Sequence, residues 1–232
     1  MYTFWEQAIE EDFEPFRLIR QTERGRVEII RHRESGRKYI LRRFTGSGEA
    51  YEKLKSIRCD NLPIIYDCAQ KEDQVLVLEE YILGDTLEDL LSCGPLEKAQ
   101  VKGISKQLCN ALWVLHQNGL VHRDIKPANI MIRGDEAVLV DFDVTRKYSE
   151  NKNSDTQLMG TVGYAPPEQY GLSQTDPRSD IYSLGVLMNI MLTGEHPSVK
   201  MARGKMGMII SRCTMTSAKQ RFKSVLLIRD LL

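Results

Sequence analysis

The nine residues that begin at position 121 read Val-His-Arg-Asp-Ile-Lys-Pro-Ala-Asn and bring chemically versatile side chains together. They include a carboxylate suited to act as a base (Asp124), two cations (Arg123 and Lys126) and an amide suited to bind a metal (Asn129). A further carboxylate, Asp141, follows a few residues later. Phosphoryl transfer needs few protein groups: one that orients the attacking hydroxyl, metal ligands, and cations for the developing charge. Residues of these types, gathered in one short stretch, are compatible with such chemistry.

In order, these residues form the pattern H-R-D-x-K-x-x-N with a D-F pair downstream, which resembles the catalytic loop and metal-binding turn of the eukaryotic-type protein kinases. A lone H-R-D tripeptide arises by chance, but the longer pattern is far more specific. The resemblance implies that Asp124 accepts the proton of the substrate hydroxyl and that Lys126 steadies the transferred phosphoryl group. It also implies that Asn129 and Asp141 hold Mg²⁺, with Mn²⁺ as an alternative, and that ATP is the donor.

Positioning these groups requires a rigid helix and a hairpin. Apolar residues recur at helical spacing over Leu96–Asn118, and Asn118-Gly119 is a helix-stop signal. Short apolar runs at Ile130–Ile132 and Val138–Val140 surround Gly134-Asp135, which predicts a hairpin. Such a hairpin would place Asn129 and Asp141 side by side at its base.

The first third of the chain predicts a small antiparallel sheet. The alternating stretches are Phe16–Gln21, Arg26–Arg33 and Lys38–Phe44, separated by turn signals. A helix is expected over Gly48–Ile57 and a further strand over Gln74–Ile82. Before the sheet, residues 3–14 are typical of a short acidic helix whose apolar residues Phe4, Ile9 and Phe13 would dock on the domain behind it.

The nucleotide-binding residues are the part of the kinase resemblance that diverges most. Of the glycine-rich lid only Gly25 and the following Val27 remain, and bare glycine amides are what allow close approach to phosphate. Arg42 stands where the family has lysine, and its helix partner would be Glu49 or, second, Glu52. Glu79, at the back of the pocket, would need a cation of its own. The residues that the resemblance assigns to ATP are Gly25, Val27, Arg42, Glu49, Glu80, Ile82 and Met131.

Several other residues match supporting positions of the family. Arg123 would capture a phosphate on an activation loop that carries Ser149, Ser154 and Thr156. Thr161 would hydrogen-bond the catalytic residues, as in serine/threonine kinases. Asp143 replaces a glycine, and aspartate tolerates the positive φ expected there. Structural roles are implied for His122, Phe142 and Asp180, and for Glu168 paired with Arg221.

Composition narrows the function classes. The 232 residues contain 32 Lys or Arg and 32 Asp or Glu, and zero net charge argues against nucleic acid as the main partner. Five scattered cysteines without a C-x-x-C pair indicate reduced thiols. Neither a signal peptide nor an apolar run of about 20 residues is evident. We therefore expect a cytoplasmic protein without a membrane span, and the kinase resemblance implies that it acts on a protein substrate.

The expected architecture is α+β and two-lobed, as in a compact bacterial-style Hanks-type serine/threonine kinase with a divergent small lobe. Residues 1–15 would form an extension, 16–80 the small lobe, 80–85 the hinge and 86–232 the large lobe. Fold does not give activity by itself. Three functions are compatible with the sequence: an active protein kinase, a pseudokinase that binds or scaffolds, and a small-molecule kinase of the aminoglycoside-phosphotransferase type.

Overall fold

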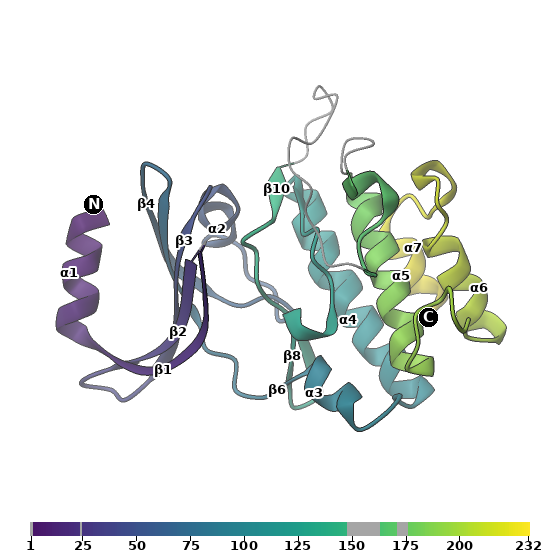
Figure 1. Ribbon diagram of the computed structural model, residues 1–232, viewed down its shortest axis with the longest axis horizontal. Coiled ribbons are helices and arrows are strands. Elements are labelled where there is room, and N and C mark those ends of the chain that lie inside the picture. Colours follow the sequence, from purple (N-terminus) through teal and green to yellow (C-terminus); the bar gives the residue numbers. More distant parts are fainter. Residues whose placement is uncertain (1, 24, 148–162, 171–175) are drawn as a thin grey trace. The chain divides into compact units, whose positions relative to one another are not determined.

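The chain forms two compact units, each built around its own core (Figure 1). The computed structural model describes residues 2–23, 25–147, 163–170 and 176–232. Unit 1 contains the residues up to Arg58 together with Pro63–Ile82, and unit 2 contains Cys59–Leu62 and Leu83–Leu232. Unit 1 is mainly an antiparallel sheet and unit 2 is mainly helical, which is the expected α+β, two-lobed organisation.

Unit 1 contains a five-stranded sheet in the order β1-β2-β3-β5-β4, in which all neighbouring strands are antiparallel. The expected three-stranded meander is confirmed, and every strand of it begins or ends within three residues of its predicted bounds. The strands are β1 (Phe13–Thr22), β2 (Gly25–His32), β3 (Lys38–Thr45), β4 (Ile65–Lys71) and β5 (Gln74–Glu80).

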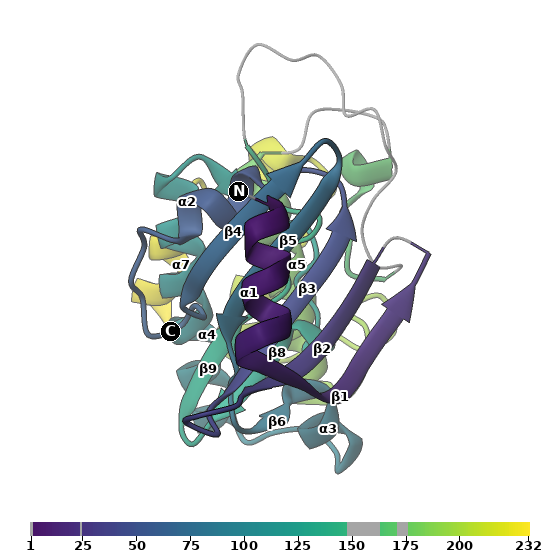
Figure 2. The same cartoon turned by 90° about the vertical axis from the view of Figure 1, so that its left-hand side faces the viewer.

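Helix α1 (Tyr2–Asp12) covers one face of this sheet, where Figure 2 shows it lying across β3, β4 and β5. Its Ile9 is buried against Ile30, Leu41 and two leucines of β5. The prediction that Phe4 docks beside Ile9 is wrong, because Phe4 is 72% exposed. Five residues advance a helix by about 500°, so Phe4 lies about 140° around the axis from Ile9. Trp5, four residues from Ile9, shares its face instead.

The opposite face of the sheet carries a second apolar group formed by Val27, Ile29 and Ile40, with Tyr81 packed against it. Helix α2 (Glu49–Leu54) is shorter than the predicted 48–57 helix. Its Tyr51 is fully buried and packs on Phe44 of β3, with 5.7 Å between ring centroids.

Unit 2 is organised on two buried helices, α4 (Lys98–Gln117) and α5 (Pro177–Thr193). Helix α4 ends as the sequence predicts, with Asn118 as its C-cap ahead of Gly119, and α5 ends at Gly194, whose φ is 72°. The hairpin of β8 (Ile130–Arg133) and β9 (Glu136–Leu139) also forms as predicted. The other elements are β6 (Asp85–Thr86), α3 (Leu87–Ser92), β7 (Leu120–Val121), β10 (Arg146–Lys147), α6 (Gly204–Cys213) and α7 (Val225–Leu231).

A four-residue segment, Cys59–Leu62, belongs to unit 2 although the sequence analysis placed it in the small lobe. The reason is a pair of hydrogen bonds to β9. Asn61 donates from Nδ2 to the Ala137 carbonyl at 3.0 Å, and its own carbonyl accepts from the Leu139 amide at 3.0 Å. Among the described helices, none is long and apolar enough to cross a membrane.

Candidate active site

The loop after β7 is anchored by a single buried carboxylate, that of Asp180 in α5. Its Oδ1 accepts from the Arg123 amide at 2.9 Å and its Oδ2 accepts from the His122 amide at 2.9 Å. The ring Nε2 of His116, in α4, lies 2.8 Å from Oδ2. The carboxylate therefore joins two helices to the backbone of the loop that carries Asp124.

The charge state of Asp180 follows from these neighbours. Burial by itself would raise the pKa of this fully buried carboxyl. The hydrogen bond and charge of His116, the charge of His122 and the Arg123 amide outweigh burial and hold the Asp180 pKa below its ordinary value. Asp180 is therefore an anion whose acceptor role is fixed at neutral pH.

Two strained backbone positions frame the candidate site, one in this loop and one in the turn after β9. Arg123 has φ 73° and Asp141 has φ 70°. Among the described non-glycine residues, only Glu72, in the β4–β5 turn, shares a positive φ with them. Such conformations cost about 1–3 kcal/mol each and persist where the surroundings over-determine them. The Asp180 contacts supply that restraint at Arg123.

Asp124, Lys126 and Asn129 converge as the spacing predicts. Lys126 Nζ lies 2.8 Å from Asp124 Oδ2. Asn129 donates from Nδ2 to the same oxygen at 3.0 Å and to the Asp124 carbonyl at 2.8 Å. The Asp124 side chain is 15% exposed, so its carboxylate is oriented by two donors and still reachable.

Asn129 and Asp141 are brought together by the base of the hairpin. The Val140 amide donates to the Asn129 carbonyl at 2.9 Å, which places Asp141 one residue further along. Because Asn129 Nδ2 points at Asp124, its amide oxygen is the atom left for a cation. An amide oxygen and a carboxylate are both ligands that suit a hard cation such as Mg²⁺. The residues present therefore fit a divalent metal.

His122 packs against the turn after β9, where it contacts the ring of Phe142. The two rings meet edge to face, with centroids 5.3 Å apart, and His122 Nε2 lies 3.2 Å from the Val140 carbonyl. The expectation that Asp143 adopts positive φ is wrong, since Asp141 is the residue that does. Asp143 therefore stands where no glycine is required by the backbone.

Within unit 1, Arg42 forms a buried ion pair with Glu79. Arg42 Nε lies 2.6 Å from Glu79 Oε1, and the two residues are 6% and 2% exposed. Sheet register explains the pairing: Arg42 lies opposite Val77 and Glu79 lies opposite Ile40, so the two are diagonal neighbours on one face.

The contact gives Glu79 the cation that the sequence analysis expected it to need. The carboxylates proposed from sequence as partners of Arg42 lie on α2. Glu49 is its first residue and is exposed, and Glu52 pairs with Lys55 at 3.4 Å. Glu79 was thus missed as the Arg42 partner, although an acid in a buried apolar strand was the signal that could have found it.

The remaining residues that the resemblance assigns to ATP lie in or next to strands, and most of them are at least partly buried. Gly25 starts β2, where an added Cβ would lie 2.4 Å from the Arg43 carbonyl, so close strand packing already requires glycine there. Val27 and Ile82 are buried. The Glu80 amide donates to the Ile64 carbonyl at 2.8 Å, so its N–H is already hydrogen-bonded within unit 1. Met131, in β8, is partly buried.

Glu168 and Arg221 form the expected ion pair, and further hydrogen bonds support both side chains. Arg221 Nη1 and Nη2 donate to the two Glu168 carboxylate oxygens in a fork, the second at 2.9 Å. Arg221 also donates to three backbone carbonyls and lies 4.9 Å from the Tyr182 ring centroid. Ser179, which sequence reasoning missed, adds a hydrogen bond to Glu168 at 3.2 Å.

The predicted activation loop lies mostly outside the described residues. Ser149, Ser154, Thr156 and Thr161 fall in the stretch 148–162. Arg123, proposed to receive a loop phosphate, is 1% exposed.

Comparison with known proteins identifies relatives among the protein kinases. Residues 22–226 match the protein kinase domain. Over 142 residues the chain is 40% identical to serine/threonine-protein kinase PknB of Mycobacterium tuberculosis (strain ATCC 25618 / H37Rv), an alignment covering 57% of this chain and 23% of PknB. Over 174 residues it is 34% identical to serine/threonine-protein kinase PknL of the same strain, covering 74% of this chain and 43% of PknL. The chain thus spans less than half the length of these relatives.

Proposed function

Because the chain belongs to the protein kinase domain family, we propose that it transfers the γ-phosphate of ATP to serine or threonine hydroxyl groups of a protein substrate. The serine/threonine assignment is supported by the relatives PknB and PknL, which carry that name. A protein substrate, rather than a small molecule, is supported by the Glu168–Arg221 pair and by the Asp180 anchor, which the resemblance associates with protein kinases.

The observation that carries the proposal is the geometry around Asp124. Two donors, Lys126 Nζ and Asn129 Nδ2, hold one carboxylate oxygen of a reachable aspartate. In the proposed reaction Asp124 orients the substrate hydroxyl and accepts its proton, and Lys126 stabilises charge on the transferred phosphoryl group. Asn129 and Asp141 would hold Mg²⁺, whose charge, when it is bound, would offset that of the phosphates.

The direct test is a phosphorylation assay with Mg-ATP on the chain itself and on a generic protein acceptor. Asp124→Asn should lower the rate by about 100- to 10,000-fold, the usual contribution of a general base. Asp135→Asn, the same chemical change in the exposed β8–β9 turn, should leave the rate unchanged. Mass spectrometry of Ser149, Ser154 and Thr156 would locate autophosphorylation. Equal rates for both variants would show that Asp124 is not the base.

A second candidate function, that of a nucleotide-binding or scaffolding pseudokinase, is favoured by the Arg42–Glu79 pair. An arginine that is paired with a buried carboxylate is less available to bind phosphates than the lysine that protein kinases have at this position. Measuring ATP binding and phosphoryl transfer separately distinguishes the two functions. A ligand that binds only the folded state stabilises it by RT ln(1 + [L]/Kd), about 2.7 kcal/mol at 100 times Kd. Stabilisation by Mg-ATP without transfer would favour the pseudokinase, and transfer would exclude it.

A further inference from the structure

The C-terminal part of unit 2 concentrates positive charge. From His196 to Arg229 the sequence contains eight Lys or Arg and no Asp or Glu, although the whole chain has 32 residues of each charge. Six of these cations are exposed: Lys200, Arg203, Lys205, Arg212, Lys219 and Lys223. Lys200 lies 3.7 Å from Glu195, and within the part of the chain that the structure describes the other five form no salt bridge.

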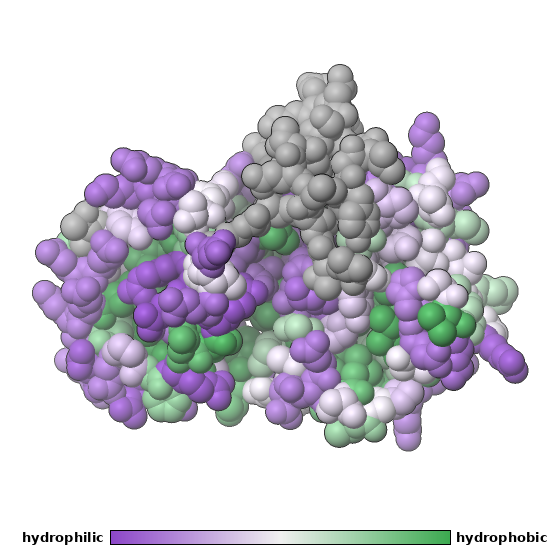
Figure 3. All heavy atoms as spheres, viewed as in Figure 1, coloured by the Kyte–Doolittle hydropathy of each residue, from purple (hydrophilic) through white to green (hydrophobic). Residues whose placement is uncertain are grey.

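Helix α6 presents part of this charge together with apolar surface. Its Met206, Ile209 and Ile210 are buried, and α6 packs on α5. Lys205, Met208 and Arg212 follow one another at positions i, i+3 and i+7 and therefore form one stripe. All three are exposed, Met208 by 69%. In Figure 3, green apolar side chains lie among purple ones at the right-hand end, where Figure 1 places α6.

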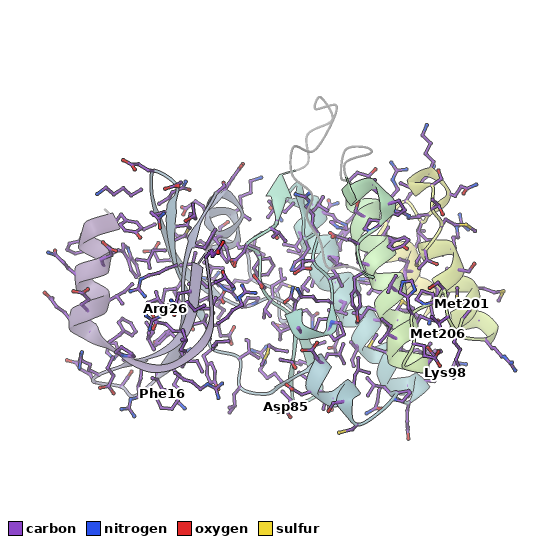
Figure 4. All side chains as sticks on the ribbon, in the orientation of Figure 1. Phe16, Arg26, Asp85, Lys98, Met201 and Met206 are labelled. Carbon is purple, nitrogen blue, oxygen red and sulfur yellow. The ribbon has the colours of Figure 1, made fainter. Side chains whose placement is uncertain are left out.

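A surface pocket of about 520 Å³ opens beside this stripe. Its lining includes Ala202, Met208, Arg212, Met215 and Gln220. The segment before α6 approaches the helix so closely that a Cβ on Gly207 would lie 2.0 Å from the Ala202 carbonyl. Three methionines are exposed on this segment, on the helix and just after it, namely Met201, Met208 and Met215. Figure 4 labels Met201 and the buried Met206 beside α6.

We propose that this pocket, together with the exposed cations Lys205 and Arg212 beside it, binds an acidic peptide segment of a partner protein. We call this region the α6 surface. One large apolar side chain of the peptide would enter the pocket. Methionines are unbranched and polarizable, so exposed ones adapt to apolar side chains of different shape. The cations around them supply electrostatic complementarity for carboxylates, which sets specificity and association rate. Such a contact therefore pairs an apolar anchor surrounded by acids on the peptide with an apolar pocket surrounded by cations on this chain.

The same surface fits other anions less well. Among the described residues that line the pocket none is aromatic, whereas binding to single-stranded nucleic acid uses aromatic stacking. An interfacial membrane helix carries a large apolar face, whereas the exposed stripe of α6 holds one apolar residue, Met208, between two cations. One apolar side chain of a peptide can pack against such a surface.

The test selects ligands without assuming their sequence and without nucleotide, so it does not depend on phosphoryl transfer. A display library of random short peptides is panned on the full chain, and selected peptides are synthesised and measured by fluorescence anisotropy. We expect enriched peptides to carry several Asp or Glu around one Leu, Met or Phe, and to bind less tightly as salt is raised.

Matched variants locate the binding. Lys205→Glu and Met208→Glu should each weaken the selected peptide by about tenfold or more, in the range seen for central interface residues. Lys71→Glu, the same charge reversal on the exposed end of β4, should leave affinity within about twofold, as for charges outside an interface. Circular dichroism of each variant confirms folding.

The proposal is overturned by a library that yields no binder, by enriched peptides that are neutral or basic, or by binding that both α6 variants leave unchanged. The proposal is also overturned if single-stranded RNA, or vesicles containing phosphatidylserine, bind more tightly than the selected peptides and lose that binding in Lys205→Glu and Met208→Glu. The surface would then bind a different class of ligand.

Discussion

Replacing Glu79 with glutamine removes one charge from the Arg42–Glu79 pair and leaves the shape of the side chain almost unchanged. Both partners are nearly inaccessible, and the bond between Arg42 Nε and Glu79 Oε1 is 2.6 Å long. The substitution therefore leaves a buried guanidinium facing a neutral amide, and the free energy of unfolding should fall.

The size of the fall follows from burial and distance. At an effective dielectric constant of about 20, unit charges separated by 2.6 Å attract by about 6 kcal/mol. Desolvation of the two groups offsets much of that attraction, and breaking a buried pair by removing one partner costs about 3–5 kcal/mol. Glutamine still offers an acceptor, so we expect about 3 kcal/mol. For a chain of this size that lowers Tm by about 6–12 °C.

Urea denaturation followed by circular dichroism measures this change. Glu136→Gln is the matched control, because Glu136 pairs with Arg133 three residues away on the surface, and such pairs contribute about 0–1 kcal/mol. The double variant Arg42→Met with Glu79→Leu adds a second measurement. Replacing both charges by apolar groups is often neutral, so it should be more stable than Glu79→Gln alone.

The reasoning fails if Glu79→Gln costs no more than the surface control. It also fails if the double variant loses as much stability as Arg42→Met and Glu79→Leu, each measured alone and added together, since an interacting pair must show coupling.

Two further predictions concern unit 2. Gly207→Ala should destabilise the protein by more than 1 kcal/mol because its Cβ would lie 2.0 Å from the Ala202 carbonyl, whereas Gly103→Ala, with no heavy atom within 4 Å, should stabilise α4 by up to about 1 kcal/mol. Opposite shifts in Tm would confirm this pair, and equal shifts would contradict it. Asp180 has a pKa lowered from 3.8, so its contribution to stability is complete above that pH and is lost as the pH falls through the lower folded pKa. The stability difference between wild type and Asp180→Asn should therefore shrink below about pH 4, and a difference that does not vary with pH would show that His116 does not hold an Asp180 anion.

The large unit was predictable because its signals are local. The apolar stripe of α4, the Asn118-Gly119 stop and the hairpin turn each lie within a short window of sequence. The convergence of Asp124 and Asn129 was predictable for the same reason, since five residues separate them and one turn brings them together.

The small unit was less predictable because its key contact depends on strand register. Arg42 and Glu79 are 37 residues apart and meet only because β3 and β5 pair in one alignment. The pairing of Arg42 with the helix carboxylates Glu49 or Glu52 stays a prediction. The positive φ was assigned to Asp143 because glycine stands there in the family, but the backbone turns at Asp141.

The position of α1 bears on how the protein should be prepared. Helix α1, residues 2–12, contributes to the core of unit 1, because its Ile9 packs against Ile30 and Leu41. A recombinant form trimmed to the matched residues 22–226 would lose both α1 and β1. It would expose the apolar face of the sheet and turn β2 into an unprotected edge, and surfaces of both kinds favour aggregation. Poor solubility of such a fragment would therefore reflect its boundaries and not the stability of the intact fold.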